Sequence, residues 1–215
     1  MARRFVREQL REGHRVSAFR CGNADLDRWL VESAASAGRR DFSRTYVWVE
    51  ASSGTRGFGT SGGPAAADAG LGEELGEVVA YFTLSGFAIA RGAVPGRLSK
   101  GEYRVIPALL LGKLALDQSL HGRGYGRILL ADAVVEAVRA SRLAAARYLV
   151  VDAVGPHAAK FYRQFGFASV TRAGSGAGAG ADPGADAPLG EAPEVGASWP
   201  LRMVARMRDL EVAVS

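Results

Sequence analysis

The sequence predicts a single mixed α/β domain, and three observations support this fold class. Apolar, β-rich segments alternate with segments of helical periodicity. A turn with three closely spaced glycines separates an apolar run from an amphipathic one. Two long stretches rich in glycine, alanine and proline interrupt the pattern without adding a second core. The length, 215 residues, suits one domain that buries a substantial core.

Six segments are predicted strands because they are short, apolar and rich in β-branched or aromatic residues: 44–51, 76–90, 107–117, 147–153, 167–170 and 201–210. The run 107–117 is almost continuously apolar, which is typical of a central strand buried on both faces. The last two segments are expected to pair with each other across a long insertion.

Three segments are predicted helices. Asn23 is a candidate N-cap, followed by Leu26, Trp29 and Leu30 at helical spacing. A helix of about four turns is expected over 126–141, with one face made by Ile128, Ala131, Val135 and Val138. Pro156 suits the first turn of a short helix over 156–165, which Gly166 would end. That helix places Ala158, Phe161, Tyr162 and Phe165 on one face.

Residues 54–76 and 173–197 are predicted flexible surface insertions. They carry seven acidic residues and one basic residue. The remainder therefore has 26 basic residues (27 less 1) against 15 acidic ones (22 less 7), a net charge of +11. A basic body fits a polyanionic partner such as nucleic acid, or a phosphate-rich cofactor, as well as it fits an ordinary arginine-rich surface.

The remaining composition predicts a cytoplasmic protein. Cys21 is the sole cysteine, which excludes an internal disulfide and a thiolate metal cluster, and the three scattered histidines do not suggest a metal site. No segment reaches the roughly 20 apolar residues of a membrane span. The first 16 residues are charged and lack the apolar region of a secretory signal.

The glycine turn at Gly122, Gly124 and Gly126 points to a phosphate site. A helix N-terminus offers about four unpaired N–H groups and a partial positive charge, and glycines let an anion approach them. A P-loop needs Gly-Lys-Ser/Thr, whereas Arg127 and Ile128 follow here. A dinucleotide fingerprint needs G-x-G-x-x-G, but the spacing is G-x-G-x-G.

The segment 121–126, "HGRGYG", instead resembles the Q/R-x-x-G-x-G/A loop of the GNAT acetyltransferases, with histidine in the first position. "LGKLALD" and "GPHAAKFYRQFGF" resemble two further motifs of that family. The resemblance implies a central mixed, mostly antiparallel sheet flanked by helices, and acetyl-coenzyme A as co-substrate without a metal. It implies cofactor binding by Leu114, Ala115, Leu116, Gly122, Arg123, Gly124, Tyr125, Gly126, Arg127 and Phe161.

Tyr162 matches the tyrosine that GNAT enzymes often use to protonate the leaving thiolate; a core role is the alternative. A phenol with a pKa near 10 can serve as a donor to a thiolate with a pKa near 8.5. Asp152 and Glu102 are candidate bases, although acids at strand ends are more often caps or surface charges. An α-amine acceptor, with a pKa near 7.7–8.0, needs little help from a base. The resemblance also implies that backbone N–H groups of Leu114–Leu116 hold the oxyanion.

The N-terminal segments "CGNADLDRWL" and "SRTYV" resemble the acetyltransferase toxins of bacterial toxin–antitoxin pairs. This implies acetylation of the α-amine of aminoacyl-tRNA, a block of translation, a ribbon-helix-helix antitoxin and a possible homodimer. Candidate tRNA contacts are Arg39, Arg40, Arg44 and Lys113, while Arg123 could contact tRNA or coenzyme phosphates. Phe19, Trp29 and Trp48 are expected in the core rather than as base-stacking platforms.

Two other functions remain open at this point. One is an N-acetyltransferase acting on a small-molecule amine or a protein N-terminus, which should need an acidic pocket rather than a basic surface. The other is a non-catalytic nucleic-acid-binding domain, for which no standard DNA-binding signature is visible.

Overall fold

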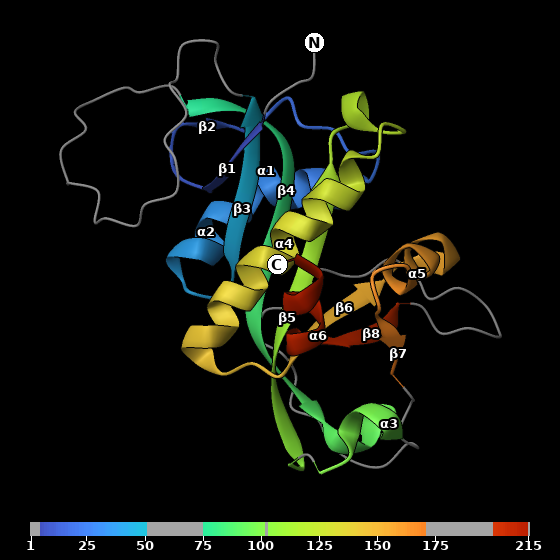
Figure 1. The fold of residues 1–215 in the computed structure, drawn as a ribbon. Helices are drawn as coiled ribbons and strands as arrows, with labels where there is room; N and C mark the ends of the chain where they lie inside the picture. Colours follow the sequence, from blue (N-terminus) through green and yellow to red (C-terminus); the bar gives the residue numbers. More distant parts are fainter. Residues whose placement is uncertain (1–4, 51–74, 102, 171–199, 215) are drawn as a thin grey trace. The chain divides into compact units, whose positions relative to one another are not determined.

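The computed structural model describes residues 5–50, 75–101, 103–170 and 200–214 as a mixed α/β fold (Figure 1). Its elements are β1 (Phe5–Gln9), β2 (His14–Arg15), α1 (Ala24–Glu32), α2 (Ala34–Arg39), β3 (Arg44–Glu50), β4 (Leu75–Ala90), η1 (Arg91–Ala93), α3 (Gly96–Ser99), β5 (Val105–Leu116), η2 (Gln118–Leu120), α4 (Tyr125–Ala144), β6 (Tyr148–Ala153), α5 (Gly155–Arg163), β7 (Ala168–Ser169), β8 (Leu201–Arg206) and α6 (Met207–Val214). The strand order is β1-β3-β4-β5-β6-β8-β7, with β2 paired to β4. The predicted fold class is confirmed.

The chain forms two compact units. The first comprises Met1–Phe82 and Lys113–Leu129, and the second comprises Thr83–Gly112 and Leu130–Ser215. Strands β4 and β5 and helix α4 run through both units, so the units are parts of one fold rather than separate domains in sequence. Each unit has its own cluster of buried apolar residues.

In the first unit, α1 forms as the sequence predicts. The Asn23 side chain accepts hydrogen bonds from the backbone N–H groups of Asp25 (3.0 Å) and Leu26 (3.3 Å), which caps the helix. Leu30 is buried, and Leu26 and Trp29 pack against the same core cluster. The helical spacing therefore identified the buried face of α1 correctly.

Tyr81 on β4 joins α1 to the rest of this core. Its ring packs edge-on against Phe19 (centroids 5.4 Å apart) and stacks on Trp29 (5.9 Å). Its hydroxyl donates to the backbone oxygen of Leu26 at 2.9 Å, so the buried polar group has a partner. Phe19 and Trp48 are buried and Trp29 packs on the core, as expected for all three aromatic residues.

In the second unit, β5 and β6 are parallel, with Ala108 opposite Tyr148 and Leu111 opposite Val151. A parallel pair needs a crossover connection, which α4 supplies. Ala108, Leu109 and Leu111 are buried, so both faces of β5 are covered along this stretch, as predicted. Strand β8 pairs antiparallel with β6 and with β7, which confirms the predicted pairing of the last two strand segments.

The predicted apolar face of α4 is wrong except at Val138. Ile128 is 52% exposed, and Ala131 and Val135 are only half-buried. The buried side chains are Leu129, Leu130, Ala133, Val134, Ala137 and Val138. Nearly every residue from Ile128 to Val138 is apolar or small, so several phases of the helix fit the pattern equally well.

Three predicted boundaries also change. Strand β8 ends at Arg206, and residues 207–210, predicted as strand, belong to helix α6. Helix α5 ends at Arg163, two residues before the predicted end, and Gly166 follows with a φ of +83°. Leu75 and Gly76 belong to β4 rather than to the insertion predicted over 54–76; the rest of that range and the insertion 173–197 lie outside the described residues.

Candidate active site

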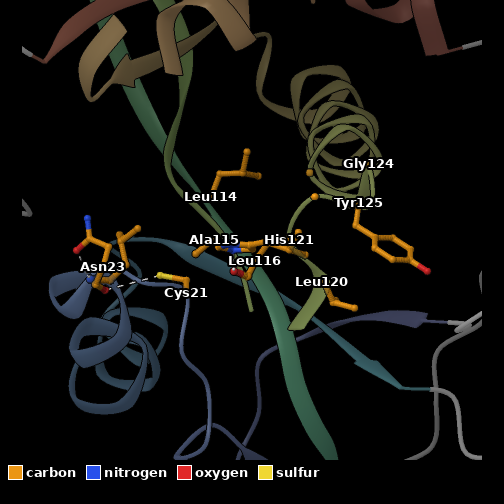
Figure 2. Close-up of a pocket in the computed structure, with 12 residues that line it drawn as sticks. Cys21, Asn23, Leu114, Ala115, Leu116, Leu120, His121, Gly124 and Tyr125 are labelled. Atoms are coloured by element: carbon orange, nitrogen blue, oxygen red, sulfur yellow. Dashed lines mark hydrogen bonds between the residues drawn. The ribbon is translucent and has the colours of Figure 1, made fainter. Parts of the chain in front are cut away.

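A pocket of about 440 Å³ lies in the first unit, where β5 leads into the glycine turn (Figure 2). Its lining residues are Cys21, Asn23, Leu26, Leu114, Ala115, Leu116, Leu120, His121, Gly122, Gly124, Tyr125 and Gly126. In Figure 2 Cys21 and Asn23 lie on one side of the Leu114–Leu116 strand end, and Gly124 and Tyr125 lie on the other. The pocket therefore joins the predicted glycine turn to the segment that precedes α1.

The backbone conformation of the turn requires glycine at two positions. Gly122 and Gly124 have φ angles of +71° and +80°, in the left-handed region that other residues rarely adopt. A Cβ placed at Gly122, Gly124 or Gly126 would meet no atom within 4 Å. Helix α4 begins at Tyr125, so the backbone N–H groups of Tyr125 and Gly126 have no acceptor in a preceding helical turn, whereas that of Arg127 donates to the oxygen of Gly124 at 3.1 Å. The arrangement is suited to an anion that approaches the backbone closely.

Asp117, directly after β5, ties the two sides of the pocket together. Its carboxylate accepts hydrogen bonds from the backbone N–H groups of Arg20 (3.0 Å) and Ser119 (2.9 Å). Burial alone would raise the pKa of this carboxyl, but these hydrogen bonds outweigh it and the net pKa is lowered. The backbone N–H of Gln118 also donates to the oxygen of Arg20 at 2.8 Å. The segment that carries Cys21 and Asn23 is thereby fixed beside the turn.

Gly22 is required at the same junction. Its φ is +89°, and a Cβ there would lie 3.0 Å from the Nε2 atom of Gln118. The Cys-Gly-Asn motif noted in the sequence therefore has a structural explanation: glycine permits the close approach, and Asn23 caps α1.

Five lining residues were not predicted as site residues: Cys21, Asn23, Leu26, Leu120 and His121. His121 directs its Nε2 at the backbone oxygen of Leu116, 2.8 Å away, which fixes the entrance to the turn. Cys21 is half-buried, and burial raises the pKa of its thiol to about 11, so the thiol is protonated near neutral pH. His121 stands at the position where the sequence departs from the family motif, and that departure was the available signal.

Seven of the ten predicted cofactor residues line the pocket: Leu114, Ala115, Leu116, Gly122, Gly124, Tyr125 and Gly126. The ring of Tyr125 points away from Cys21 and packs edge-on against Phe5, with centroids 5.3 Å apart. Arg123 and Arg127 are exposed near the start of α4 and do not line the pocket. Phe161 lies on α5 in the second unit, where its ring packs against Tyr162 and Phe165.

Tyr162 lies on α5, and 9% of it is exposed. Its ring packs against Phe161 (5.4 Å between centroids) and Phe167 (5.6 Å). Burial, with a smaller contribution from the negative charge of Asp152, raises the pKa of Tyr162 to about 12. Its hydroxyl is therefore a neutral hydrogen-bond donor at any physiological pH.

Of the two candidate general bases, the structure describes only Asp152. Asp152 forms an ion pair with Arg202, whose Nε and Nη2 atoms each donate to one carboxylate oxygen at 2.8 Å. Both carboxylate oxygens of Asp152 are therefore already hydrogen-bonded. Glu102 lies outside the described residues.

The four predicted tRNA contacts have local partners. Arg39 lies 3.9 Å from a carboxylate oxygen of Glu12, Arg40 lies over the ring of Phe42, and Arg44 donates to Asp41 at 2.6 Å. The ammonium of Lys113 lies 4.2 Å from the centroid of the Trp29 ring, and burial lowers the pKa of Lys113. All four cations belong to the first unit.

The described residues offer neither a candidate metal site nor a candidate membrane-spanning helix. Among them, no group of three or more His, Cys, Asp and Glu residues could hold a metal ion. Of the helices that the structure describes, none is both long and apolar enough to cross a membrane.

Comparison with known families identifies the fold. Residues 68–169 match the model of the acetyltransferase (GNAT) domain. These 102 residues, just under half of the chain, are similar to the GNAT acetyltransferase domain. The glycine turn, the strand before it and α5 all lie within the matched residues.

A curated relative of this chain is the tRNA-acetylating toxin of Mycobacterium tuberculosis. The two are 35% identical over 92 residues, which are 43% of this chain and 55% of that protein. The chain thus spans about half the length of the curated relative that it matches.

Similar solved structures extend over nearly the whole chain. AtaT complexed with acetyl-methionyl-tRNAfMet has a TM-score of 0.70 at 21% identity, covering 99% of this chain and 100% of that one. A mutant of KacT has a TM-score of 0.69 at 21% identity, covering 97% and 98%. A mutant AtaT toxin bound to the C-terminus of the antitoxin AtaR and acetyl-CoA has a TM-score of 0.64 at 21% identity, covering 98% of each chain. At these identities the likeness establishes the GNAT fold.

Proposed function

We propose that this chain is an acetyl-CoA-dependent N-acetyltransferase that acetylates the α-amine of aminoacyl-tRNA and so blocks translation. The observation that carries the proposal is the pocket at the start of α4, where left-handed glycines leave open space beside a helix N-terminus. The M. tuberculosis relative, a tRNA-acetylating toxin, supports the choice of acceptor.

The residues of the pocket fit acetyl-CoA. The pyrophosphate would occupy the open space at Gly122, Gly124 and Gly126. The N-terminus of α4 would stabilise its negative charge. Leu114 and Leu116 would border the pantetheine arm, and the backbone N–H groups of this strand end would hold the oxyanion. The exposed Arg123 and Arg127 lie where they would add positive charge near the phosphates.

Tyr162 is the proposed donor to the leaving sulfur. The α-amine nitrogen attacks the thioester carbonyl carbon, the C–S bond breaks, and the sulfur takes a proton while the amine loses one. With a pKa of about 12, the Tyr162 hydroxyl stays protonated and stabilises the developing thiolate by donating a hydrogen bond. The proton released by the amine balances the thiol that leaves.

Two features support aminoacyl-tRNA as the acceptor: the positive charge of the protein, and the fact that an α-amine needs little help from a general base. The body of the chain outside residues 54–76 and 173–197 carries a net +11, which favours a phosphate backbone. Asp152 is engaged by Arg202, and an α-amine with a pKa near 8 is partly neutral without a base. A lysine side chain, with a pKa near 10.4, would need more help.

Two corollaries complete the proposal. The enzyme would act in the cytoplasm, where charged tRNA is used. It would also be neutralised by a small ribbon-helix-helix antitoxin and could act as a homodimer, and a similar AtaT structure includes an antitoxin C-terminus.

The test is transfer of labelled acetyl from acetyl-CoA to a pool of charged tRNA. Deacylated tRNA, free amino acids and a peptide with a free N-terminus serve as alternative acceptors. The proposal predicts label on charged tRNA alone, with transfer reduced about 100-fold to 10,000-fold in Tyr162→Phe. Label on peptides or small amines instead would establish the other N-acetyltransferase function, and transfer unaffected by Tyr162→Phe would remove Tyr162 from the mechanism.

A further inference from the structure

The closed end of the β4–β5 hairpin in the second unit is rich in basic residues. It comprises residues 91–105, which form η1, α3 and the start of β5, and α3 marks it in Figure 1. The sequence of this hairpin end contains four cations, Arg91, Arg97, Lys100 and Arg104, against one acid, Glu102. Its net charge is therefore +3 within 15 residues.

The hairpin end is anchored to the sheet at several points. The hydroxyl of Tyr148 on β6 and a guanidinium nitrogen of Arg206 on β8 both donate to the backbone oxygen of Leu98, the latter at 2.8 Å. The same Arg206 nitrogen donates to the oxygen of Arg97 at 3.2 Å. Val94 and Ile106 are buried in the core of this unit. The backbone that carries the cations is thus fixed by side chains from two neighbouring strands.

The side chains of the hairpin end face solvent. Arg91, Arg97, Lys100 and Arg104 are all exposed, Val105 is 63% exposed and Tyr103 is 85% exposed. Within the part of the chain that the structure describes, Arg97, Lys100 and Arg104 form no ion pair. By contrast, Arg39 and Arg44 in the first unit each lie beside a carboxylate. A cation that is not held in an ion pair is available to a polyanion.

We propose that the hairpin end 91–105 is an RNA-contacting surface, in which Arg97, Lys100 and Arg104 bind phosphates and Tyr103 packs against a sugar or base. The proposal rests on the proposed function, because it names a second surface for the same tRNA substrate. An exposed aromatic ring among cations is the combination that favours RNA over an acidic protein: the ring offers a stacking face and the cations follow the backbone.

The experiment compares wild type, the triple variant Arg97→Gln/Lys100→Gln/Arg104→Gln, and Tyr103→Ala. Binding of fluorescent deacylated tRNA is measured by anisotropy at several salt concentrations, which needs no acetyl transfer. We expect the triple variant to bind at least 10-fold more weakly, and its salt slope to fall by about 3, one for each lost phosphate contact. Tyr103→Ala should weaken binding about 5-fold or more, whereas Tyr103→Phe should retain it.

The matched control is Arg139→Gln/Arg208→Gln in the same unit. These arginines are exposed but lie beside Glu136 (3.7 Å) and Asp209 (3.3 Å), so their removal should change tRNA affinity by less than about 2-fold. Unchanged acetyl-CoA affinity and melting temperature in every variant would exclude misfolding.

The two proposals fail in different ways. Equal tRNA affinity and salt slope in wild type and the triple variant would overturn the RNA surface, as expected if an acidic protein binds there, while transfer to charged tRNA would still stand. If no acetyl reaches charged tRNA yet the triple variant loses tRNA binding, the surface holds and the proposed acceptor is wrong.

Discussion

Asp152 on β6 and Arg202 on β8 form a bidentate ion pair. The Nε and Nη2 atoms of Arg202 donate to the Oδ1 and Oδ2 atoms of Asp152, each at 2.8 Å. The guanidinium also lies 4.8 Å from the centre of the Phe87 ring. The carboxylate contributes to the raised pKa of Tyr162, so the pair sets the charge beside the proposed proton donor. No spacing in the sequence links residues 152 and 202.

This pair predicts opposite shifts for two variants. Asp152→Asn removes a negative charge and should lower the pKa of Tyr162 from about 12, though not to its ordinary value near 10, because burial is the larger cause. Arg202→Gln removes the positive charge beside Asp152 and should raise the pKa of Tyr162 further. Alkaline titration by tyrosinate absorbance, with the Tyr162→Phe background subtracted, measures both. Shifts in the same direction would contradict this account of the pair.

Tyr162 should also make stability depend on pH in the alkaline range. Its folded pKa, about 12, lies above the unfolded value near 10, so its contribution is complete below pH 10 and is lost as the pH rises toward 12. The loss amounts to about 2 kcal/mol between pH 10 and pH 12. Urea unfolding of wild type should therefore lose stability faster than that of Tyr162→Phe between pH 10 and 12. Parallel curves would show that the Tyr162 hydroxyl is not desolvated.

Alanine should be tolerated at Gly126 and harmful at Gly124. Gly126 is in the first turn of α4 without a positive φ, and a Cβ there meets nothing within 4 Å. Gly126→Ala should leave stability unchanged or raise it by about 0.5 kcal/mol, since alanine favours helix. Because the last position of the motif takes glycine or alanine, this variant should bind acetyl-CoA within about 2-fold of wild type by calorimetry. The matched variant Gly124→Ala, at φ +80°, should lower both stability and acetyl-CoA affinity. Full acetyl-CoA affinity in Gly124→Ala would place the phosphates elsewhere.

Cys21 should react slowly with alkylating reagents. Because the pKa of its thiol is raised to about 11, the thiolate fraction at pH 8 is on the order of 100-fold below that of an ordinary cysteine. Iodoacetamide labelling followed by mass spectrometry should accelerate about 10-fold per pH unit up to pH 10. Saturating acetyl-CoA should slow labelling further, since Cys21 lines the pocket. A rate that levels off below pH 9 would contradict the raised pKa.

Local signals predicted much of this structure. The Asn23 cap and the spacing of Leu26, Trp29 and Leu30 gave α1, because a cap and an amphipathic stripe are properties of one short segment. The glycine spacing identified a turn in which Gly122 and Gly124 have left-handed backbones. Of the ten predicted coenzyme residues, the seven that line the pocket come from the end of β5 and from the turn, whereas Arg123 within the turn, Arg127 and Phe161 do not line it.

The sequence-based predictions fail where contacts between distant residues determine the local structure. Alternation of apolar residues with arginine continues from β8 through Met207, so the pattern does not show that the strand ends at Arg206 and a helix begins. In α4, Ile128 and Leu129 are equally apolar neighbours, and only packing selects Leu129 as buried. His121, Cys21 and the Asp152–Arg202 pair depend on contacts between distant segments or with the backbone, which spacing cannot reveal.

The most direct test of the proposed reaction is mass spectrometry of the aminoacyl-adenosine released by nuclease from charged tRNA after incubation with the protein and acetyl-CoA. The account predicts one added acetyl group on the α-amine of the aminoacyl group, and none on the nucleotides. Unmodified aminoacyl-adenosine, from a protein shown to bind acetyl-CoA, would contradict the proposed acceptor while leaving the GNAT fold in place.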